Sequence, residues 1–206
     1  MDTMYSTLLS RVSRMPRGTI FFVEDLLDTG ISPEALRAVL SLMVRDGSGE
    51  VIRLARGIFC RPALNPQMKI LYPSGERIAQ EAARHWRVRI APCGAQAANL
   101  AGFYGVPVLP LDFVTDGSEQ TINLVNGNVI HFMRRKSVKV FSFRNERLRN
   151  LVEGVRFLGK ENISFEEREI IAKNLVGIPE GEFIHDVKLS PGWIQEILLE
   201  IRPSFT

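Results

Sequence analysis

The sequence lacks the features that mark several large classes of protein. Cysteine is rare, because Cys60 and Cys93 are the only two, which excludes both a disulfide framework and a zinc site built from cysteines alone. No apolar run approaches the roughly 18–20 residues that span a bilayer, and the first residues do not combine a basic segment with an apolar one as a secretory signal does. We therefore expect no membrane partner and a cytoplasmic location, where cysteines stay reduced.

Metal and cofactor motifs are also missing. The three histidines, His85, His131 and His185, are far apart in the sequence, and neither cysteine has a partner at C-x-x-C spacing. Residues 154–160 match the start of the phosphate-binding loop G-x-x-x-x-G-K, but Glu161 stands where that loop needs a Ser or Thr to bind magnesium. This segment is better interpreted as the end of a helix, and the sequence predicts neither a metal nor a cofactor.

What the sequence does have is an ordinary globular composition with an uneven charge. Hydrophobic residues make up 45% of the 206 residues and charged residues 24%, which suits one or two folded domains. Within the net charge of +3, residues 1–61 carry eight basic and seven acidic side chains, residues 62–145 ten and five, and residues 146–206 eight and eleven. The first two thirds could therefore face a polyanion. All eight basic residues of the first segment are arginine, which suits contacts to phosphates and guanine, although a general preference for arginine would give the same count.

The first 61 residues follow the order helix, short strand, helix, helix and basic hairpin. The segments are residues 4–15 and 23–29 as helices, 19–21 as the strand, a stronger helix that begins at Ser32-Pro33, and a hairpin of residues 51–54 and 58–60. Serine at the N-cap and proline at the first helical position favour the start of the stronger helix. This is the order of a winged helix-turn-helix, which places its third helix in the major groove of DNA.

The candidate DNA contacts lie on the third helix and on the hairpin. Leu36, Val39 and Met43 are spaced to form a buried stripe, so the other side of that helix would face DNA. The hairpin arginines would reach phosphates or the minor groove. We therefore predict the following DNA-binding residues: Ser32, Glu34, Arg37, Ser41, Arg45, Arg53 and Arg56. A small helical subdomain used for protein contacts is the alternative interpretation.

After a linker at residues 62–67, residues 68–206 are expected to form an α+β domain. Residues 68–145 predict a small, mainly antiparallel sheet, with a hairpin around Asn126-Gly127, and residues 146–206 predict a helical C-terminal tail. The densest basic patch could contact DNA phosphates or an RNA, or could be a solvated strand end. Its members are Arg134, Arg135, Lys136 and Lys139.

Five sequence segments together resemble one group of winged-helix proteins. They are EVIRLARGIFCRP (50–62), RIAPCGAQAANLAG (89–102), FVTDG (113–117), RFLGK (156–160) and PGWIQEIL (191–198). Their order and spacing, over nearly the whole chain, are similar to those of the AbiEi-like antitoxins of bacterial type IV toxin–antitoxin and abortive-infection systems. One departure is Phe21-Phe22-Val23, where that family usually places Ser or Thr at the N-cap of the second helix, which weakens the case for a phosphate contact there.

The resemblance implies a transcriptional repressor that binds double-stranded operator DNA and controls its own operon. It also implies a nucleotidyltransferase-like toxin as the functional partner, which an antitoxin of this type counters without needing a stable complex. Residues 68–206 would then support a homodimer or act against the toxin. The chain itself would have no catalytic activity.

Two other classes of function stay open from the residues alone. Asp112, Asp116 and Glu119 are close in sequence and would suit a metal-dependent nuclease or nucleotidyltransferase, although Asp116 begins what is more simply an Asp-Gly turn. Cys93 lies at a predicted strand-to-helix turn, where a thiolate could act with His131, but a small buried cysteine is commoner. The third class is a ligand-sensing regulator. Carboxylates gathered in a cleft of the second domain would favour the enzyme, and a deep apolar cavity would favour the sensor.

Overall fold

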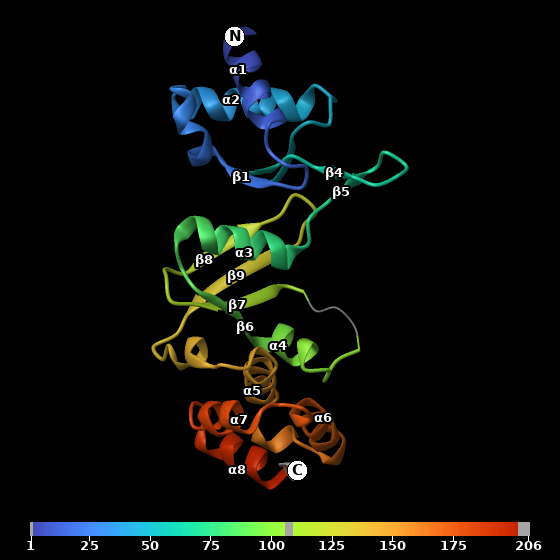
Figure 1. The fold of residues 1–206 in the computed structure, drawn as a ribbon, viewed down its shortest axis with the longest axis vertical. Helices are drawn as coiled ribbons and strands as arrows, with labels where there is room; N and C mark the ends of the chain where they lie inside the picture. Colours follow the sequence, from blue (N-terminus) through green and yellow to red (C-terminus); the bar gives the residue numbers. More distant parts are fainter. Residues whose placement is uncertain (1, 106–108, 202–206) are drawn as a thin grey trace. The chain divides into compact units, whose positions relative to one another are not determined.

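The computed structural model describes residues 2–105 and 109–201, and its fold is mixed α+β (Figure 1). Residues 106–108 and 202–206 of the expected second domain lie outside the described residues. The chain forms two compact units: the first is Met1–His85 with Ile122–Val129, and the second is Trp86–Thr121 with Ile130–Thr206. Within the described ranges, no helix combines the length and the apolar content that crossing a membrane requires.

Three helical segments and a three-stranded sheet build most of the first unit. They are α1 (Asp2–Ser13), β1 (Ile20–Phe22), η1 (Val23–Thr29), α2 (Pro33–Arg45), β2 (Ile52–Ala55) and β3 (Ile58–Cys60). The sheet is antiparallel, with the order β1-β3-β2. One apolar cluster joins these elements, and Leu8 of α1, Leu26 of η1 and Leu40 of α2 are fully buried in it. Burial of each such side chain contributes about 1.5–3 kcal/mol, so this cluster holds the unit together.

Residues 23–29, expected as a short helix, form the 3-10 helix η1. Val23 and Leu26 are its buried residues, and their spacing of three positions matches the three residues per turn of a 3-10 helix. The Asp25 carboxylate accepts a hydrogen bond from the backbone N–H of Phe22 at 2.8 Å. Gly30 ends the segment in the left-handed region at a φ of 74°. Phe22 occupies the N-cap position of η1 and has no side-chain oxygen to cap the helix. The hydrogen bond from its backbone N–H to Asp25 therefore stabilises the start of η1.

The expected linker at residues 62–67 is part of the folded structure. It contains strand β4 (Ala63–Leu64), which pairs with β5 (Ile70–Leu71) as a short antiparallel hairpin. The Asn65 side chain closes this hairpin, because its Oδ1 accepts hydrogen bonds from two backbone N–H groups of the turn at 3.0 and 2.8 Å. Frequent proline suggested a linker, but an Asn-Pro pair also begins a turn. The first unit continues beyond this hairpin into α3 (Gly75–Trp86).

A segment distant in sequence completes the first unit. Residues Ile122–Val129 form the tip of the hairpin between β8 (Gln120–Asn123) and β9 (Val129–Arg134). The N–H of Val125 donates a hydrogen bond to the carbonyl of Leu54 at 2.9 Å, and the residue before it forms a β-bridge to β2. This tip therefore covers the outer edge of β2, and the compact units divide the chain differently from the expected boundary at residue 61.

The largest sheet contains β6 (Ile90–Pro92), β7 (Leu111–Thr115), β8 and β9 in the order β6-β7-β9-β8. The expectation of a small, mainly antiparallel sheet is confirmed: β6 and β7 pair antiparallel, and β8 and β9 are the two arms of the hairpin around Asn126-Gly127, whereas β7 and β9 pair parallel. The chain runs from β7 to the outer strand β8 first and then returns through β9 to the position beside β7. On one face of this sheet, the rings of Phe113 and Phe132 stack with their centroids 5.9 Å apart.

Helices form the rest of the second unit. They are α4 (Gly94–Leu100), α5 (Glu146–Leu158), α6 (Phe165–Leu175), α7 (Glu180–Val187) and α8 (Gly192–Ile201), with the 3-10 segments η2 (Lys139–Ser142) and η3 (Lys160–Asn162). Helix α5 packs against α4 and against α6, α7 and α8 (Figure 1). The described part of the expected C-terminal tail is therefore helical, but it shares its core with α4 and is not a separate appendage.

Two buried features position α5. Gly154 allows α4 to approach closely, because a Cβ at this position would lie 2.8 Å from the Cα of Ala98. At the start of α5, the fully buried Asp186 carboxylate accepts a hydrogen bond from the N–H of Asn145 at 2.8 Å. The segment that resembles a phosphate-binding loop thus forms the second half of α5 and its end at Gly159, which confirms the helical interpretation.

Candidate functional site

The polar side of α2 is exposed, as the sequence predicted. The Ser32 hydroxyl accepts a hydrogen bond from the N–H of Ala35 at 3.3 Å and thereby caps the helix, so it serves the fold. Leu36, Val39 and Met43 are buried in the core of the first unit, which turns the opposite side of α2 toward solvent. The exposed or half-buried residues on that side are Glu34, Arg37, Ser41 and Arg45.

These polar side chains are held to different extents. The Arg37 guanidinium lies 3.7 Å from the Glu34 carboxylate, and both side chains are mostly exposed. Ser41 donates its hydroxyl hydrogen to the carbonyl of Arg37 at 2.7 Å, and the Nε of Arg45 donates to the carbonyl of Ser41 at 3.1 Å. Exposed ion pairs contribute roughly 0–1 kcal/mol, so Arg37 can exchange Glu34 for another partner at little cost.

The β2–β3 hairpin of the same unit presents two further arginines, Arg53 and Arg56. Arg53 lies opposite Phe59 in the β2–β3 ladder, with its guanidinium carbon 5.4 Å from the centre of the Phe59 ring. The exposed Arg53 side chain therefore also packs over the fully buried ring of Phe59. Arg56 is exposed in the two-residue turn between β2 and β3, which Gly57 closes in the left-handed region at a φ of 77°. Arg56 is the better placed of the two for a phosphate.

Other arginines of this unit serve the fold. Arg17 and Arg61 share the carboxylate of Glu50, with N–O distances of 3.0 and 3.4 Å. Arg61 also donates to the carbonyl of Ser13 at 2.6 Å, which ties β3 to the end of α1. The arginine-only composition of residues 1–61 therefore combines structural ion pairs with accessible charges, a distinction that composition alone could not make.

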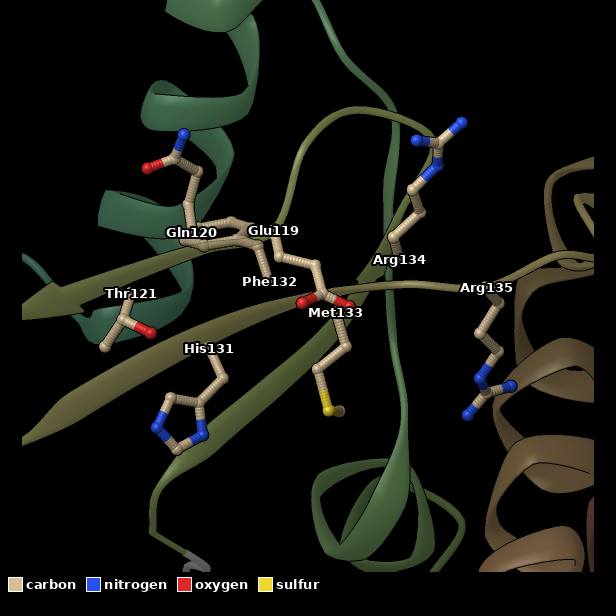
Figure 2. A pocket seen from close by; sticks show the side chains of 8 residues that line it. All are labelled: Glu119, Gln120, Thr121, His131, Phe132, Met133, Arg134 and Arg135. Carbon is tan, nitrogen blue, oxygen red and sulfur yellow. The ribbon is translucent and has the colours of Figure 1, made fainter.

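Of the four residues expected to form a second basic patch, three lie together in the structure. Arg134, Arg135 and Lys136 line one hollow of about 350 Å³, whereas Lys139 lies in η2 and does not line it. Arg135 is engaged, because its Nη1 lies 2.6 Å from the carboxylate of Glu153, a residue of α5 whose side chain is only 3% exposed. A larger hollow of about 680 Å³ includes both arginines and extends along β8 and β9 (Figure 2).

The larger hollow contains a histidine–carboxylate pair that sequence reasoning missed. His131 lines the hollow, and its Nδ1 lies 2.9 Å from Oδ1 of Asp112, its direct partner in the parallel β7–β9 ladder. Thr121 of β8 and Glu119 lie on the same side of the strands as His131 (Figure 2). The available signal was weak: Asp112 and His131 each interrupt an apolar strand, but nothing local indicated that those strands pair.

The carboxylates considered for an enzyme are brought together only in part, since Asp116 and Glu119 both line the smaller hollow but Asp112 does not. Asp112 is paired with His131, and Asp116 binds the guanidinium of Arg89 at 2.8 Å. Over residues 2–105 and 109–201, no group of three or more His, Cys, Asp or Glu side chains is placed to hold a metal ion. Cys93 is fully buried, and this burial raises the pKa of its thiol to about 12, which disfavours the thiolate that a nucleophile requires.

Comparisons with known proteins give a family and one distant structural likeness. The model of DUF6088, described as a family of unknown function, matches residues 7–178. No curated protein matches the chain. Among solved structures, the chain is similar to the RV2827C protein from Mycobacterium tuberculosis, with 14% sequence identity and a TM-score of 0.41, over 99% of this chain and 83% of that chain.

Proposed function

We propose that this chain, which belongs to the DUF6088 family of unknown function, is a DNA-binding transcriptional regulator. The observation that carries the proposal is the two-sided character of α2. Its apolar side is buried in the core of the first unit, and its other side presents Arg37 together with Glu34, Ser41 and Arg45. The major groove admits one α-helix, and a helix that reads bases there needs an exposed polar side with a long donor such as arginine.

The elements around α2 fit a winged helix-turn-helix, in which α2 is the recognition helix and β2–β3 the wing. The order α1, β1, η1, α2, β2, β3 and the sheet order β1-β3-β2 support this assignment. The wing is short, because only Arg56 and Gly57 separate its strands, and Val125 occupies its outer edge. We therefore assign Arg56 to a phosphate and not to deep insertion into the minor groove.

The expected strength of phosphate binding follows from the number of exposed cations on this surface. Arg45, Arg53 and Arg56 are exposed, and Arg37 is assigned to a base. About three phosphate contacts per chain predict that log affinity falls against log salt concentration with a slope near −3. A homodimer on two half-sites would double this slope and would place its two copies of α2 about 34 Å apart.

We further propose that the regulator is the antitoxin of an AbiEi-like system. The support is the resemblance of the five segments described above. In this role the chain represses its own operon in the cytoplasm, counters a nucleotidyltransferase-like toxin encoded beside it, and needs no catalytic residue or cofactor of its own. The first unit would carry repression, so a variant that loses DNA binding should still protect cells from the toxin.

The test of DNA binding uses the full chain and the duplex upstream of its own gene, with a scrambled duplex of equal composition as the control. We expect fluorescence anisotropy at fixed salt to show at least ~10³-fold preference for the upstream duplex, the lower end for specific DNA-binding proteins. Equal affinity for the two duplexes would contradict a regulator of its own operon.

The test of antitoxin action is co-expression with the neighbouring gene. We expect the chain to restore growth of cells that express that neighbour, and we expect Arg37→Ala to relieve repression while it leaves protection intact. Failure to protect, with the chain present at normal level, would contradict the antitoxin assignment and leave DNA binding to be judged by the first test.

A further inference from the structure

The face of β8 and β9 that carries His131 offers a site of small-molecule size. The larger hollow, about 680 Å³, lies within the range of roughly 300–1,000 Å³ that is usual for small-molecule sites. Figure 2 shows Thr121 and His131 toward one end of it, Glu119 and Met133 in the middle, and Arg135 toward the other end. The smaller hollow overlaps it at Glu119, Arg134 and Arg135 and adds Lys136.

We propose that these joined hollows bind a nucleotide, with the phosphate at the Arg134–Lys136 end and the nucleoside toward His131 and Thr121. The proposal concerns the second unit and goes beyond the DNA-binding function assigned to the first. The two ends are far enough apart for such a ligand, since the four residue steps of nearly extended chain from His131 to Arg135 span roughly 13 Å.

The phosphate end is positively charged and partly preorganised. Arg134 and Lys136 are exposed, and no hydrogen bond or ion pair with another described residue engages either side chain. Arg135 is held at the edge of the hollow by the buried Glu153, which leaves its other guanidinium nitrogens for a ligand. The carboxylate of Asp116 at this end is already bound by Arg89, so it opposes a phosphate only weakly.

The nucleoside end offers neutral and acidic hydrogen-bonding groups. Asp112 holds the Nδ1 of His131, which fixes the ring and leaves Nε2 for a ligand. The Thr121 hydroxyl can both donate and accept, and the Glu119 carboxylate can accept from amino groups of a base or from ribose hydroxyls. Glu119 lines both hollows, so its carboxylate also lies beside the phosphate end, where Arg134, Arg135 and Lys136 outnumber it.

Isothermal titration calorimetry of the full chain tests this proposal. The probes are AMP, GMP, CMP and UMP, the matching nucleosides, and inorganic phosphate. We expect at least one monophosphate to bind at least tenfold more tightly than its nucleoside. The double variant Arg134→Gln, Lys136→Gln should weaken that binding at least tenfold, because it removes the free charges of the phosphate end. Glu119→Gln should weaken the nucleotide but not inorganic phosphate.

Lys173→Gln is the matched control, because Lys173 is an exposed cation on α6 outside both hollows, and it should leave binding unchanged. Circular dichroism verifies that each variant is folded. No binding of any monophosphate at millimolar concentration, or equal binding by the double variant, would overturn the proposal. Binding of short oligonucleotides without binding of monophosphates would also overturn it and would indicate a surface for nucleic-acid strands. Arg37→Ala should leave nucleotide binding intact, so the two proposals can fail separately.

Discussion

The exposed side of α2 and the hollowed face of β8 and β9 both present arginines, but the structure holds those arginines in different ways. Arg37 on α2 has an exposed carboxylate at 3.7 Å as its partner, an arrangement that adds little stability. Arg135 beside β9 is 2.6 Å from Glu153, whose side chain is almost completely buried. A loosely held arginine can adjust to a long polymer, whereas an anchored one favours a ligand of fixed size.

This difference also separates binding from stability in the two units. We expect that charges on α2 can be removed with little effect on folding. Removal of the Glu153 carboxylate, in contrast, takes away the ion-pair partner of Arg135. Of the two tryptophans of the chain, Trp193 belongs to the second unit, whereas Trp86 ends α3, whose other residues belong to the first. The fluorescence of Trp193 therefore reports unfolding of the second unit, while DNA binding reports on the first, and the following substitutions use both signals.

Glu153→Ala should have the largest effect. It removes a buried carboxylate that lies 2.6 Å from Arg135 and 3.6 Å from Arg156; because both arginines keep solvent contact, we expect a loss of about 2–3 kcal/mol, below that of a fully buried ion pair. Urea unfolding followed by tryptophan fluorescence should show this loss, with the exposed Glu161→Ala as the control that changes little. A loss below about 1 kcal/mol would mean that Arg135 is not anchored and would remove the contrast with α2.

Gly154→Ala should have an intermediate effect in the same unit. Alanine normally stabilises a helix by about 1 kcal/mol relative to glycine, but here its Cβ would lie 2.8 Å from the Cα of Ala98. We expect a net loss of about 1–3 kcal/mol from overpacking between α4 and α5. Gly181→Ala in α7 is the matched control, because nothing lies within 4 Å of its added Cβ, and it should not destabilise. Stabilisation by Gly154→Ala would show that the helices separate easily.

Glu34→Gln should have the smallest effect and acts only on the first unit. It releases Arg37 from its exposed partner and removes a negative charge from the side of α2 that we assign to DNA. Stability should not change, and affinity for operator and scrambled duplexes should rise together by about 1 kcal/mol or less. A fall in operator affinity alone, measured by anisotropy, would instead assign Glu34 a base contact such as the amino group of cytosine.

Local sequence patterns predicted helix α2, but they did not predict the hollow along β8 and β9. Ser32-Pro33 and the apolar stripe define α2 because capping and helical periodicity act within a few residues. The pair of Asp112 and His131 depends on direct parallel pairing of β7 with β9, although β8 comes between them in the sequence, and an alternating pattern does not specify such pairing. For the same reason, the contact of Val125 with Leu54 could not be predicted.

The sequence also could not predict which arginines form structural ion pairs and which remain accessible. Arg17 and Arg61 look like the other arginines of residues 1–61 until the shared Glu50 is placed between them. Residues 62–67, expected as a linker, contain strand β4, because the Asn65 side chain closes a hairpin in this proline-rich stretch. Counts of residue types predicted a basic surface, and only tertiary contacts decide which charges are available to a ligand.

The measurement that tests the central claim most directly is fluorescence anisotropy of Arg37→Ala, Arg56→Ala and the double variant across a salt series. The probes are the operator and a scrambled duplex, with Lys173→Ala as the control and circular dichroism to verify folding. Arg37→Ala should lose about 1–3 kcal/mol on the operator and little on the scrambled duplex. Arg56→Ala should weaken both equally and make the salt slope shallower by about one unit. Operator binding that is unchanged in the double variant would contradict the assignment of α2 and the hairpin to DNA.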